Sequence, residues 1–271
     1  MLFVADTHVV AVNVPDQDAL LARVAEQLAA GEGFALATIN LDHLVKLRRD
    51  PAFAAAYAAQ DLVVADGNPV VWLSRLAGRR VSLVPGSDVV LPLARVAAEA
   101  GVGVALVGST EAALAAAAIA MQRSIPGLRI VAQIAPAMGF DPDGPVAAGV
   151  LEAVRASGAR LVLVALGAPK QERFAARGRV LLPGVGFAGV GAGLDFLAGT
   201  QRRAPGWVRI LAMEWLWRLL WDPSRLARRY AACGMILPGE VLRALSLRRR
   251  NGPAQRYSIS LDGRPRERFQ R

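Results

Sequence analysis

Polar residues follow three apolar runs of the sequence, at the positions where a parallel sheet binds its ligands. The first run, Phe34–Ile39, contains Thr38 and is followed by Asn40, Asp42 and His43. These side chains offer hydrogen-bond donors and acceptors to a ligand. Asn40 or Asp42 would also serve as the N-cap of a following helix. The local pattern favours that second explanation, with His43 on the helix surface.

A carboxylate follows the second run, Leu62–Ala65. Asp66 is followed by Gly67, which opens the turn, and then by Asn68 and Pro69. A carboxylate that points from a strand end into a partly desolvated crevice suits a general base. An Asx-turn that leads into a helix begun by proline explains the same residues equally well. The local pattern therefore leaves both roles open.

The third run leads into Leu166-Gly167-Ala168-Pro169-Lys170-Gln171-Glu172. Gly167 permits close approach of the backbone to a ligand. Lys170, one of two lysines in the chain, and Gln171 fall in the first turn of the next helix, whose N-terminus attracts anions. A solvated first helical turn is the alternative explanation.

Two further patterns are weaker. Gly184-Val185-Gly186-Phe187-Ala188-Gly189 has the glycine spacing of a dinucleotide loop. It precedes no clear helix and lacks an acid about 20 residues further on, so we expect no NAD site. Asp141 and Asp143 have the spacing of metal-binding acids, but the proline between them and Gly144 predict a turn and a helix cap. A single cysteine and two histidines argue against a Cys- or His-based metal centre.

Positive charge is concentrated in the last quarter of the chain. The formal net charge is +10, yet residues 1–199 hold 16 Lys and Arg against 17 acids. Residues 200–271 hold 16 Arg against five acids, a balance of +11. This composition suits the headgroup region of an anionic membrane, or a solvated helix whose aromatic rings pack on the core. Four of the five tryptophans lie among these arginines: Trp207, Trp215, Trp217 and Trp221.

Arginine spacing in this segment suits phosphate binding. Arg218, Arg225 and Arg229 are seven and four residues apart, so they share one face if their helices are nearly collinear. Guanidinium groups bind phosphate through two parallel hydrogen bonds. Charge alone would favour a solvated helix face. Three more arginines lie close by in the sequence: Arg202, Arg203 and Arg228.

Short apolar runs alternate with Ala-rich stretches along residues 1–200, which is typical of an α/β sheet with parallel crossovers. Asp88 and Thr110 are candidate N-caps. The expected strands are Val9–Val14, Phe34–Ile39, Leu62–Ala65, Val102–Val107, Leu128–Ile134, Leu161–Leu166 and a short one near Val185. The expected helices span about residues 17–30, 41–48, 51–59, 68–77, 88–100, 110–122, 143–157 and 169–178.

The C-terminal segment predicts helices over Pro205–Trp221 and Ser224–Met235. After Pro238-Gly239 we expect a third, short helix to about Arg250. Residues 251–271 hold many charges and few apolar side chains, so we expect them to be disordered. The uncharged stretches are shorter than the roughly 20 residues of a membrane-spanning helix, and we expect no cleaved signal peptide.

Taken together, these segments resemble the WecG/TagA/CpsF glycosyltransferase family over roughly residues 8–235. The order and spacing of the segments carry the resemblance. They are Thr38-Ile39-Asn40-Leu41-Asp42-His43, Ala65-Asp66-Gly67-Asn68-Pro69-Val70-Val71-Trp72, Gly86-Ser87-Asp88, Leu166-Gly167-Ala168-Pro169-Lys170-Gln171-Glu172, Gly184-Val185-Gly186, and Arg203-Ala204-Pro205 through Glu214-Trp215-Leu216-Trp217-Arg218-Leu219 to Pro223-Ser224-Arg225-Leu226-Ala227-Arg228-Arg229-Tyr230.

The resemblance implies a Rossmann-like, mostly parallel sheet with helices on both faces over residues 1–200 and a membrane-docking helical appendage over 201–250. It implies inverting transfer of a sugar from a UDP-sugar to an undecaprenyl-diphosphate-linked glycan at the cytoplasmic face of the plasma membrane. The sugar would be of the N-acetylmannosamine type, or of the glucose or glucuronic-acid type. The implied partners are donor, acceptor and an anionic membrane surface, without nucleic acid; a homo-oligomer stays open.

Carried over residue by residue, the family's general base corresponds to Asp66. Arginines and helix N-termini would stabilise the departing diphosphate, so we expect no metal or other cofactor. Where relatives often carry Arg-Val-Thr-Gly, this chain has Leu83-Val84-Pro85-Gly86, with Arg79 and Arg80 nearby in sequence. The predicted substrate-binding residues are Thr38, Asn40, Asp42, Asn68, Asp88, Lys170, Gln171, Arg203, Arg218, Arg225, Arg228 and Arg229.

Two other classes of protein stay in view. A membrane-associated scaffold of the same fold would result if the missing arginine at Leu83 abolishes catalysis. A basic nucleic-acid-binding protein would explain the charge of residues 200–271. That class would not explain why polar residues gather at the strand ends.

Overall fold

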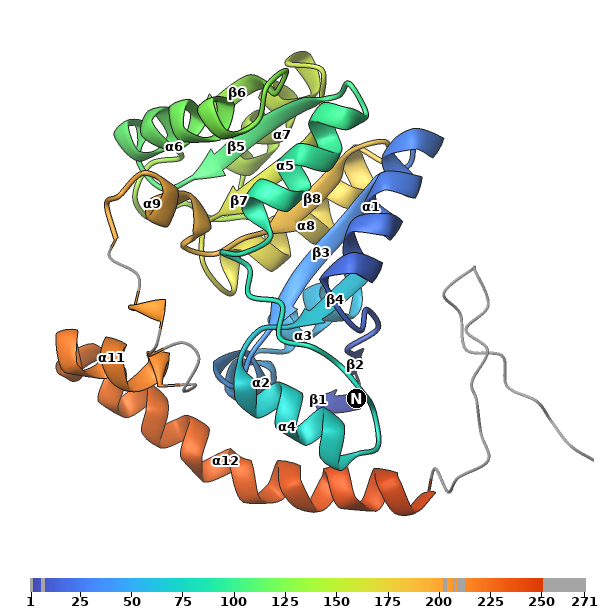
Figure 1. Cartoon of the computed structure of the whole chain (residues 1–271), viewed down its shortest axis with the longest axis vertical. Coiled ribbons are helices and arrows are strands. Elements are labelled where there is room, and N and C mark those ends of the chain that lie inside the picture. Colours follow the sequence, from blue (N-terminus) through green and yellow to red (C-terminus); the bar gives the residue numbers. More distant parts are fainter. Residues whose placement is uncertain (1, 6–7, 202–203, 207, 209–212, 251–271) are drawn as a thin grey trace, which may run out of the picture.

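The computed structural model describes residues 2–5, 8–201, 204–206, 208 and 213–250. Among these residues, six strands form one parallel sheet in the order β4-β3-β8-β7-β5-β6 (Figure 1). The expected mostly parallel α/β sheet is therefore confirmed. The strands are β3 (Phe34–Ile39), β4 (Leu62–Ala65), β5 (Gly103–Gly108), β6 (Arg129–Ile134), β7 (Ala159–Ala165) and β8 (Gly186–Gly189).

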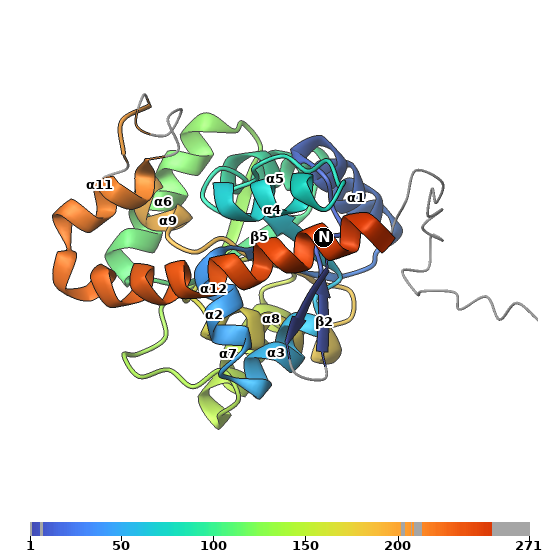
Figure 2. The same cartoon turned by 90° about the horizontal axis from the view of Figure 1, so that it is seen from below.

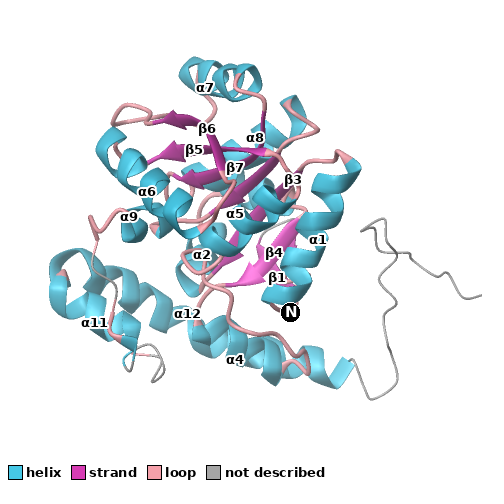
Figure 3. Ribbon diagram, turned by 45° about the horizontal axis from the view of Figure 1, so that its top comes forward, coloured by secondary structure: helices cyan, strands magenta, loops and turns pink. Residues whose placement is uncertain are grey.

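Helices cover both faces of the sheet (Figure 3). Successive strand residues point to opposite faces. Leu36 therefore packs in a core with the helices of one face, and Ala35 packs in a second core with those of the other. The first face carries α1 (Gln17–Ala30), α5 (Val90–Glu99) and α6 (Glu111–Ser124), and the second carries α7 (Pro145–Ala156) and α8 (Lys170–Leu181).

A third core lies where β3 and β4 end. There Ile39 and Ala65 pack with apolar residues of three short helices. These helices are α2 (Leu41–Leu47), α3 (Pro51–Ala58) and α4 (Asn68–Leu76).

Local capping explains why most helix boundaries agree with the expected ones within three residues. The Thr110 side chain accepts a hydrogen bond from the backbone N–H of Ala113 at 3.2 Å, as predicted for an N-cap. Asp88 is not a cap, which corrects the prediction: α5 begins after Val89 and has no side-chain cap hydrogen bond. The short helix α9 (Gly193–Leu197) was not expected, because its surroundings are rich in glycine.

The N-terminal segment differs from its prediction. Strand β2 (His8–Ala11) ends three residues before Val14 and pairs with β1 (Leu2–Ala5) in a separate antiparallel hairpin. Asn13 provides the reason. Its Oδ1 accepts from Val63 N at 2.8 Å, and its Nδ2 donates to Asp61 O at 2.7 Å. The Asn13 side chain thus makes hydrogen bonds to the backbone beside β4, where a regular strand would pair through its own backbone.

The C-terminal segment contains α11 (Glu214–Trp221) and α12 (Pro223–Arg250). Helix α12 is continuous through Pro238, so the predicted third helix after Pro238-Gly239 is wrong. Tertiary packing outweighs the lost hydrogen bond, because Ala244 beyond the proline is buried in the third core and Ile236 packs against it. Helix α12 runs across α2 and α4 (Figures 1 and 2).

Two predictions for the C-terminal quarter lie partly or wholly outside the described residues. These are the start of the helix expected from Pro205 and the disorder expected for residues 251–271. Within the described ranges, no helix has both the length and the apolarity needed to cross a bilayer.

Candidate active site

Asp66 and Thr38 meet where two neighbouring parallel strands end. In the register, Ile39 of β3 lies opposite Ala65 of β4, and Asp66 N donates to Ile39 O at 2.8 Å. The Thr38 hydroxyl donates to Asp66 Oδ2 at 3.3 Å. Thr38 is buried and Asp66 is half-buried. The carboxylate predicted as a general base therefore lies at the ligand-binding edge of the sheet, held by a hydroxyl from the adjacent strand.

Asn40 caps helix α2, as one of the two explanations predicted. Its Oδ1 accepts from the backbone N–H of His43 at 3.1 Å. Gly67, with φ of 120°, brings the start of α4 against Asn40: an added Cβ on Gly67 would lie 3.5 Å from the Asn40 Cβ. Asn68, the first residue of α4, follows directly and is half-buried. Asn40, Asp66 and Asn68 thus belong to one cluster.

The loop that carries Asp88 approaches the same cluster. A Cβ built on Gly86 would lie 3.3 Å from Thr38 Oγ1, so this loop lies directly over the end of β3. Asp88 is half-buried and accepts from Ser87 Oγ at 3.5 Å. The structure therefore brings Asp88 close to the site although it does not cap a helix.

Gln171 is buried at the start of α8, with 2% of its surface exposed. Its Oε1 accepts from Gly191 N at 3.2 Å, and its Nε2 donates to Glu172 Oε1 at 2.9 Å. A solvated first turn is thus excluded for Gln171, although Lys170 is partly exposed. Gln171 ties α8 to the loop that follows β8.

Glu172 is a buried carboxyl that the sequence did not single out. Only 1% of its surface is exposed, and Oε2 has no hydrogen-bond partner among the described residues. Burial raises the pKa of Glu172 from its usual 4.5 to about 7, although the hydrogen bond from Gln171 lowers it. Burial, together with the charges of Glu172 and Asp66, also raises the pKa of Tyr57 well above 10.

His43 is buried, which corrects its predicted place on the helix surface. Its Nδ1 lies 3.0 Å from the Tyr57 hydroxyl. Burial lowers the pKa of His43 from 6.5 to about 3, and the positive charges of Lys46 and Arg229 act in the same direction. His43 is therefore neutral near pH 7 and supports α2 rather than supplying charge.

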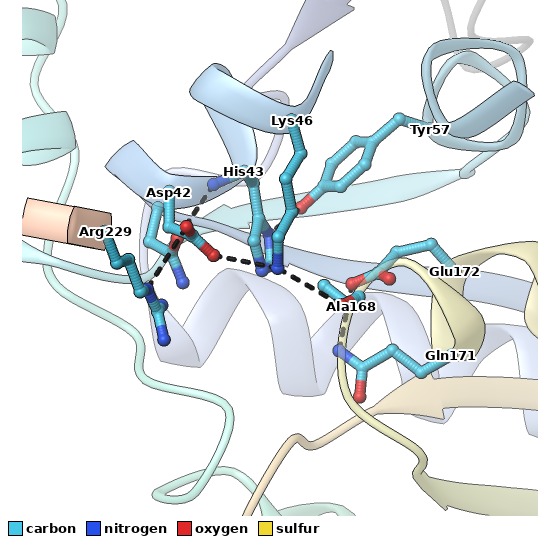
Figure 4. A network of polar contacts seen from close by, with 9 residues as sticks. Asp42, His43, Lys46, Tyr57, Ala168, Gln171, Glu172 and Arg229 are labelled. Carbon is cyan, nitrogen blue, oxygen red and sulfur yellow. Dashed lines mark hydrogen bonds and ion pairs between the residues drawn. The ribbon is translucent and has the colours of Figure 1, made fainter. Parts of the chain in front are cut away.

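Asp42 joins the C-terminal helix to the site (Figure 4). Its Oδ1 lies 3.1 Å from Nε of Arg229 on α12, and its Oδ2 lies 2.9 Å from Nζ of Lys46. The same Lys46 Nζ donates to Ala168 O at 3.1 Å. Lys46 was not predicted, although its position four residues after Asp42 is a known signal for an ion pair on a helix.

A hollow of about 400 Å³ lies beside this ion-pair chain. Four cationic side chains and two carboxylates line it, which leaves an excess of positive charge suited to an anion. Arg228, predicted to bind substrate, lies there and is exposed. The lining residues are Asp42, Val45, Lys46, Arg49, Asp50, Pro169, Arg228, Arg229 and Ala232.

Other predicted arginines are placed elsewhere or not described. Arg79 and Arg80 line a different hollow of about 550 Å³ with Pro15 and Asp16. It lies beyond the C-terminal end of α4, roughly 13 Å of helix from Asp66. Arg203 lies outside the described residues, as do the side chains of Arg218 and Arg225.

The weaker sequence patterns have structural explanations. An added Cβ on Gly186 would lie 2.4 Å from the Phe34 ring, so this glycine permits packing between β8 and β3. Asp141 Oδ1 accepts from Asp143 N at 3.0 Å, which forms the predicted turn. Within the described residues, no group of three or more His, Cys, Asp and Glu side chains is arranged to hold a metal ion.

A parallel sheet with helices on both faces and polar side chains at its carboxyl edge defines an α/β protein with a ligand site at that edge. The sequence model described as "Glycosyl transferase WecG/TagA/CpsF family" matches residues 6–251. The chain therefore belongs to the WecG/TagA/CpsF family of glycosyltransferases.

Two curated relatives are similar to about three quarters of the chain. The N-acetylglucosaminyldiphosphoundecaprenol N-acetyl-beta-D-mannosaminyltransferase of Bacillus spizizenii is 29% identical over 204 residues, 74% of this chain and 76% of the relative. The protein of the same name from Bacillus subtilis is 29% identical over 199 residues, 72% of this chain and 75% of the relative.

Proposed function

We propose that this glycosyltransferase moves a sugar of the N-acetylmannosamine type from a UDP-sugar to an undecaprenyl-diphosphate-linked glycan in cell-surface polysaccharide synthesis. The relatives' names, which specify a mannosaminyl group and a diphosphoundecaprenol acceptor, support this substrate class. The observation that carries the proposal is the Asp66 carboxylate held by Thr38 at the carboxyl edge of the sheet. A sugar of the glucose or glucuronic-acid type is the alternative donor.

The chemistry is a single displacement with inversion. Asp66 takes the proton of the acceptor hydroxyl, whose oxygen attacks the anomeric carbon. The bond from that carbon to UDP breaks on the opposite face, and UDP leaves with the bonding electrons. A base for this step lies within about 3 Å of the acceptor oxygen. The hydrogen bond from Thr38 restricts rotation of the Asp66 carboxylate and keeps it at the strand end.

The departing diphosphate needs positive charge. Cationic groups of α2 and α12 supply it at the hollow that contains Lys46, Arg49, Arg228 and Arg229. Arg203, Arg218 and Arg225 complete the proposed set of diphosphate ligands. The mechanism requires no metal ion, because guanidinium and ammonium groups perform the charge stabilisation.

The proposed location is the cytoplasmic face of the plasma membrane, with the protein bound peripherally. Large apolar side chains are exposed on α4, α11 and α12, next to the arginines of the C-terminal quarter. Exposed apolar groups beside cationic groups favour an anionic membrane surface. The side chains are Trp72, Trp215, Leu220, Trp221, Met235 and Leu242.

The test is a panel of UDP-sugars incubated with a short-chain lipid-diphosphate acceptor, with product detected by mass spectrometry. Asp66→Asn keeps the shape and removes the base, so transfer should fall about 10²- to 10⁴-fold. Asp18→Asn, which changes an exposed carboxylate on α1, is the matched control and should transfer normally. EDTA should not change the rate.

Equal transfer by Asp66→Asn and the wild type would remove Asp66 as the base. Absence of transfer by the wild type with every UDP-sugar would instead favour the scaffold alternative, and recovery by Mn²⁺ after EDTA would refute metal independence.

A further inference from the structure

Helix α12 contacts α2 through two buried carboxylates. The first is Glu240 of α12, with 1% of its surface exposed, which pairs with Arg48 of α2 and lies 3.3 Å from Arg243. The second is Asp42 of α2, which pairs with Arg229 near the start of α12. The two pairs hold different halves of the same helix, and the Asp42 pair lines the cationic hollow.

The ion pair between Asp42 and Arg229 is part of a longer chain of polar contacts. Each carboxylate oxygen has its own cation, Arg229 on Oδ1 and Lys46 on Oδ2. Lys46 also donates to Ala168 O, the carbonyl directly before Pro169. Helix α8 begins two residues later, and Gln171 N donates to Gly167 O at 3.0 Å. One carboxylate therefore links α12 to the loop that places Gln171 (Figure 4).

Burial makes this link sensitive to loss of either partner. Asp42 is nearly buried, and a buried carboxylate is costly unless cations compensate it. Among the described residues, Asp42 is the only carboxylate in an ion pair with Arg229. If α12 moves away, Asp42 loses its ion pair with Arg229 and keeps only the one with Lys46. Lys46 is then drawn towards Asp42, which weakens its hydrogen bond to Ala168 O.

We propose that Asp42 is a positioning residue that couples the seating of α12 to the conformation of residues 167–171. With α12 in place, Asp42 forms an ion pair with Arg229 at the wall of the cationic hollow. Through Lys46 it also holds the Ala168 carbonyl and the start of α8. The catalytic part of this inference depends on the proposed function; the structural part does not.

Hydrogen–deuterium exchange of the full-length protein tests the structural part. Asp42→Asn should accelerate exchange roughly tenfold in residues 223–237 and also in 167–175, because local opening follows the lost contact. Arg229→Gln should accelerate the same two segments. The double variant should exchange no faster than the faster single variant, since both changes break one contact.

Arg228→Gln is the matched control for exchange. It removes the same charge from the same hollow, but its side chain is exposed and makes no ion pair with Asp42 among the described residues. In Arg228→Gln, residues 223–237 and 167–175 should exchange hydrogen for deuterium as fast as in the wild type. An unchanged 167–175 segment in Asp42→Asn, or additive effects in the double variant, would overturn the coupling.

Steady-state kinetics test the catalytic part. Asp42→Asn and Arg229→Gln should each lower kcat about tenfold with less change in the donor KM, and the double variant should match the slower single variant. If each residue bound substrate independently, the two losses would multiply, which would refute the coupling. Absence of transfer by the wild type would contradict the proposed function, while the exchange data would still decide whether Asp42 couples the two segments.

Discussion

Asp66 and Glu172 are two carboxyl groups in different environments near the same edge of the sheet. Asp66 is half-buried and accepts a hydrogen bond from a hydroxyl. Glu172 is buried, and one of its oxygens has no hydrogen-bond partner in the part of the chain that the structure describes. Both charges raise the pKa of Tyr57, so both lie within electrostatic reach of one phenol. The proposed mechanism uses the half-buried Asp66 as the base, and Glu172 is its buried neighbour.

Burial of Glu172 makes stability depend on pH. Its pKa is about 7 in the folded protein and near 4.5 when unfolded, so the folded state binds more protons between these values. The free energy of unfolding therefore decreases as pH rises from about 4.5 to about 7. Glu172→Gln keeps an oxygen acceptor for Gln171 and removes this dependence.

We expect Glu172→Gln to be as stable as the wild type near pH 4.5 and more stable, by about 1–3 kcal/mol, at pH 8. Urea unfolding at both pH values measures the free energy of unfolding of each protein. The difference between the two proteins isolates the effect of Glu172, because the other titrating groups are the same in both. The opposite result, a variant less stable at pH 8, would mean that the ionised carboxylate stabilises the fold.

Helix α12 shows that tertiary packing can outweigh the low helix propensity of a proline. A proline inside a helix removes one hydrogen bond and costs about 3 kcal/mol relative to alanine. Pro238 nevertheless lies within α12, because apolar residues on both sides of it pack against the third core. Ion pairs of Asp42 and Glu240 hold the helix on both sides as well.

Pro238→Ala should therefore stabilise the protein, by up to about 3 kcal/mol, because it restores the missing N–H. Gly234→Ala is the companion variant: a Cβ there meets nothing within 4 Å, so a gain of about 1 kcal/mol is expected. Thermal unfolding measures both. A lower Tm for Pro238→Ala together with a higher Tm for Gly234→Ala would show that the packing of α12 needs the local geometry of the proline.

At the scale of the whole molecule, charge and exposed apolar surface lie on the same part of the chain. The excess of arginine falls in residues 200–271. Helix α11 in that segment exposes Leu220 and Trp221, by 72% and 66%. Such a surface favours vesicles that carry negative charge.

The full-length protein should bind phosphatidylglycerol vesicles more tightly than phosphatidylcholine vesicles, and 0.5 M salt should weaken this binding. Replacing Leu220 and Trp221 together by serine should reduce binding at least tenfold, since each apolar side chain contributes up to about 1.5–3 kcal/mol when the membrane buries it fully. Ile119→Ser on α6, an apolar residue with 52% of its surface exposed on another element, is the control in co-sedimentation. Equal binding by all variants would argue against α11 as the docking surface.

Features that depend on neighbours along the chain could be predicted from the sequence. Apolar runs, helix caps such as Thr110 and the position of Asp66 after a strand predicted most of the parallel sheet and its ligand-binding edge. The physical reason is that strand periodicity, capping and turn formation involve residues a few positions apart.

The tertiary structure alone decided which side chains lose water and which charges meet. His43 and Glu172 are polar by type and buried by packing, and α12 continues through Pro238 because distant elements support it. Asp42 meets Arg229 only because α12 returns across α2. Burial and ion pairing depend on elements far apart in sequence, and no local pattern contains that information.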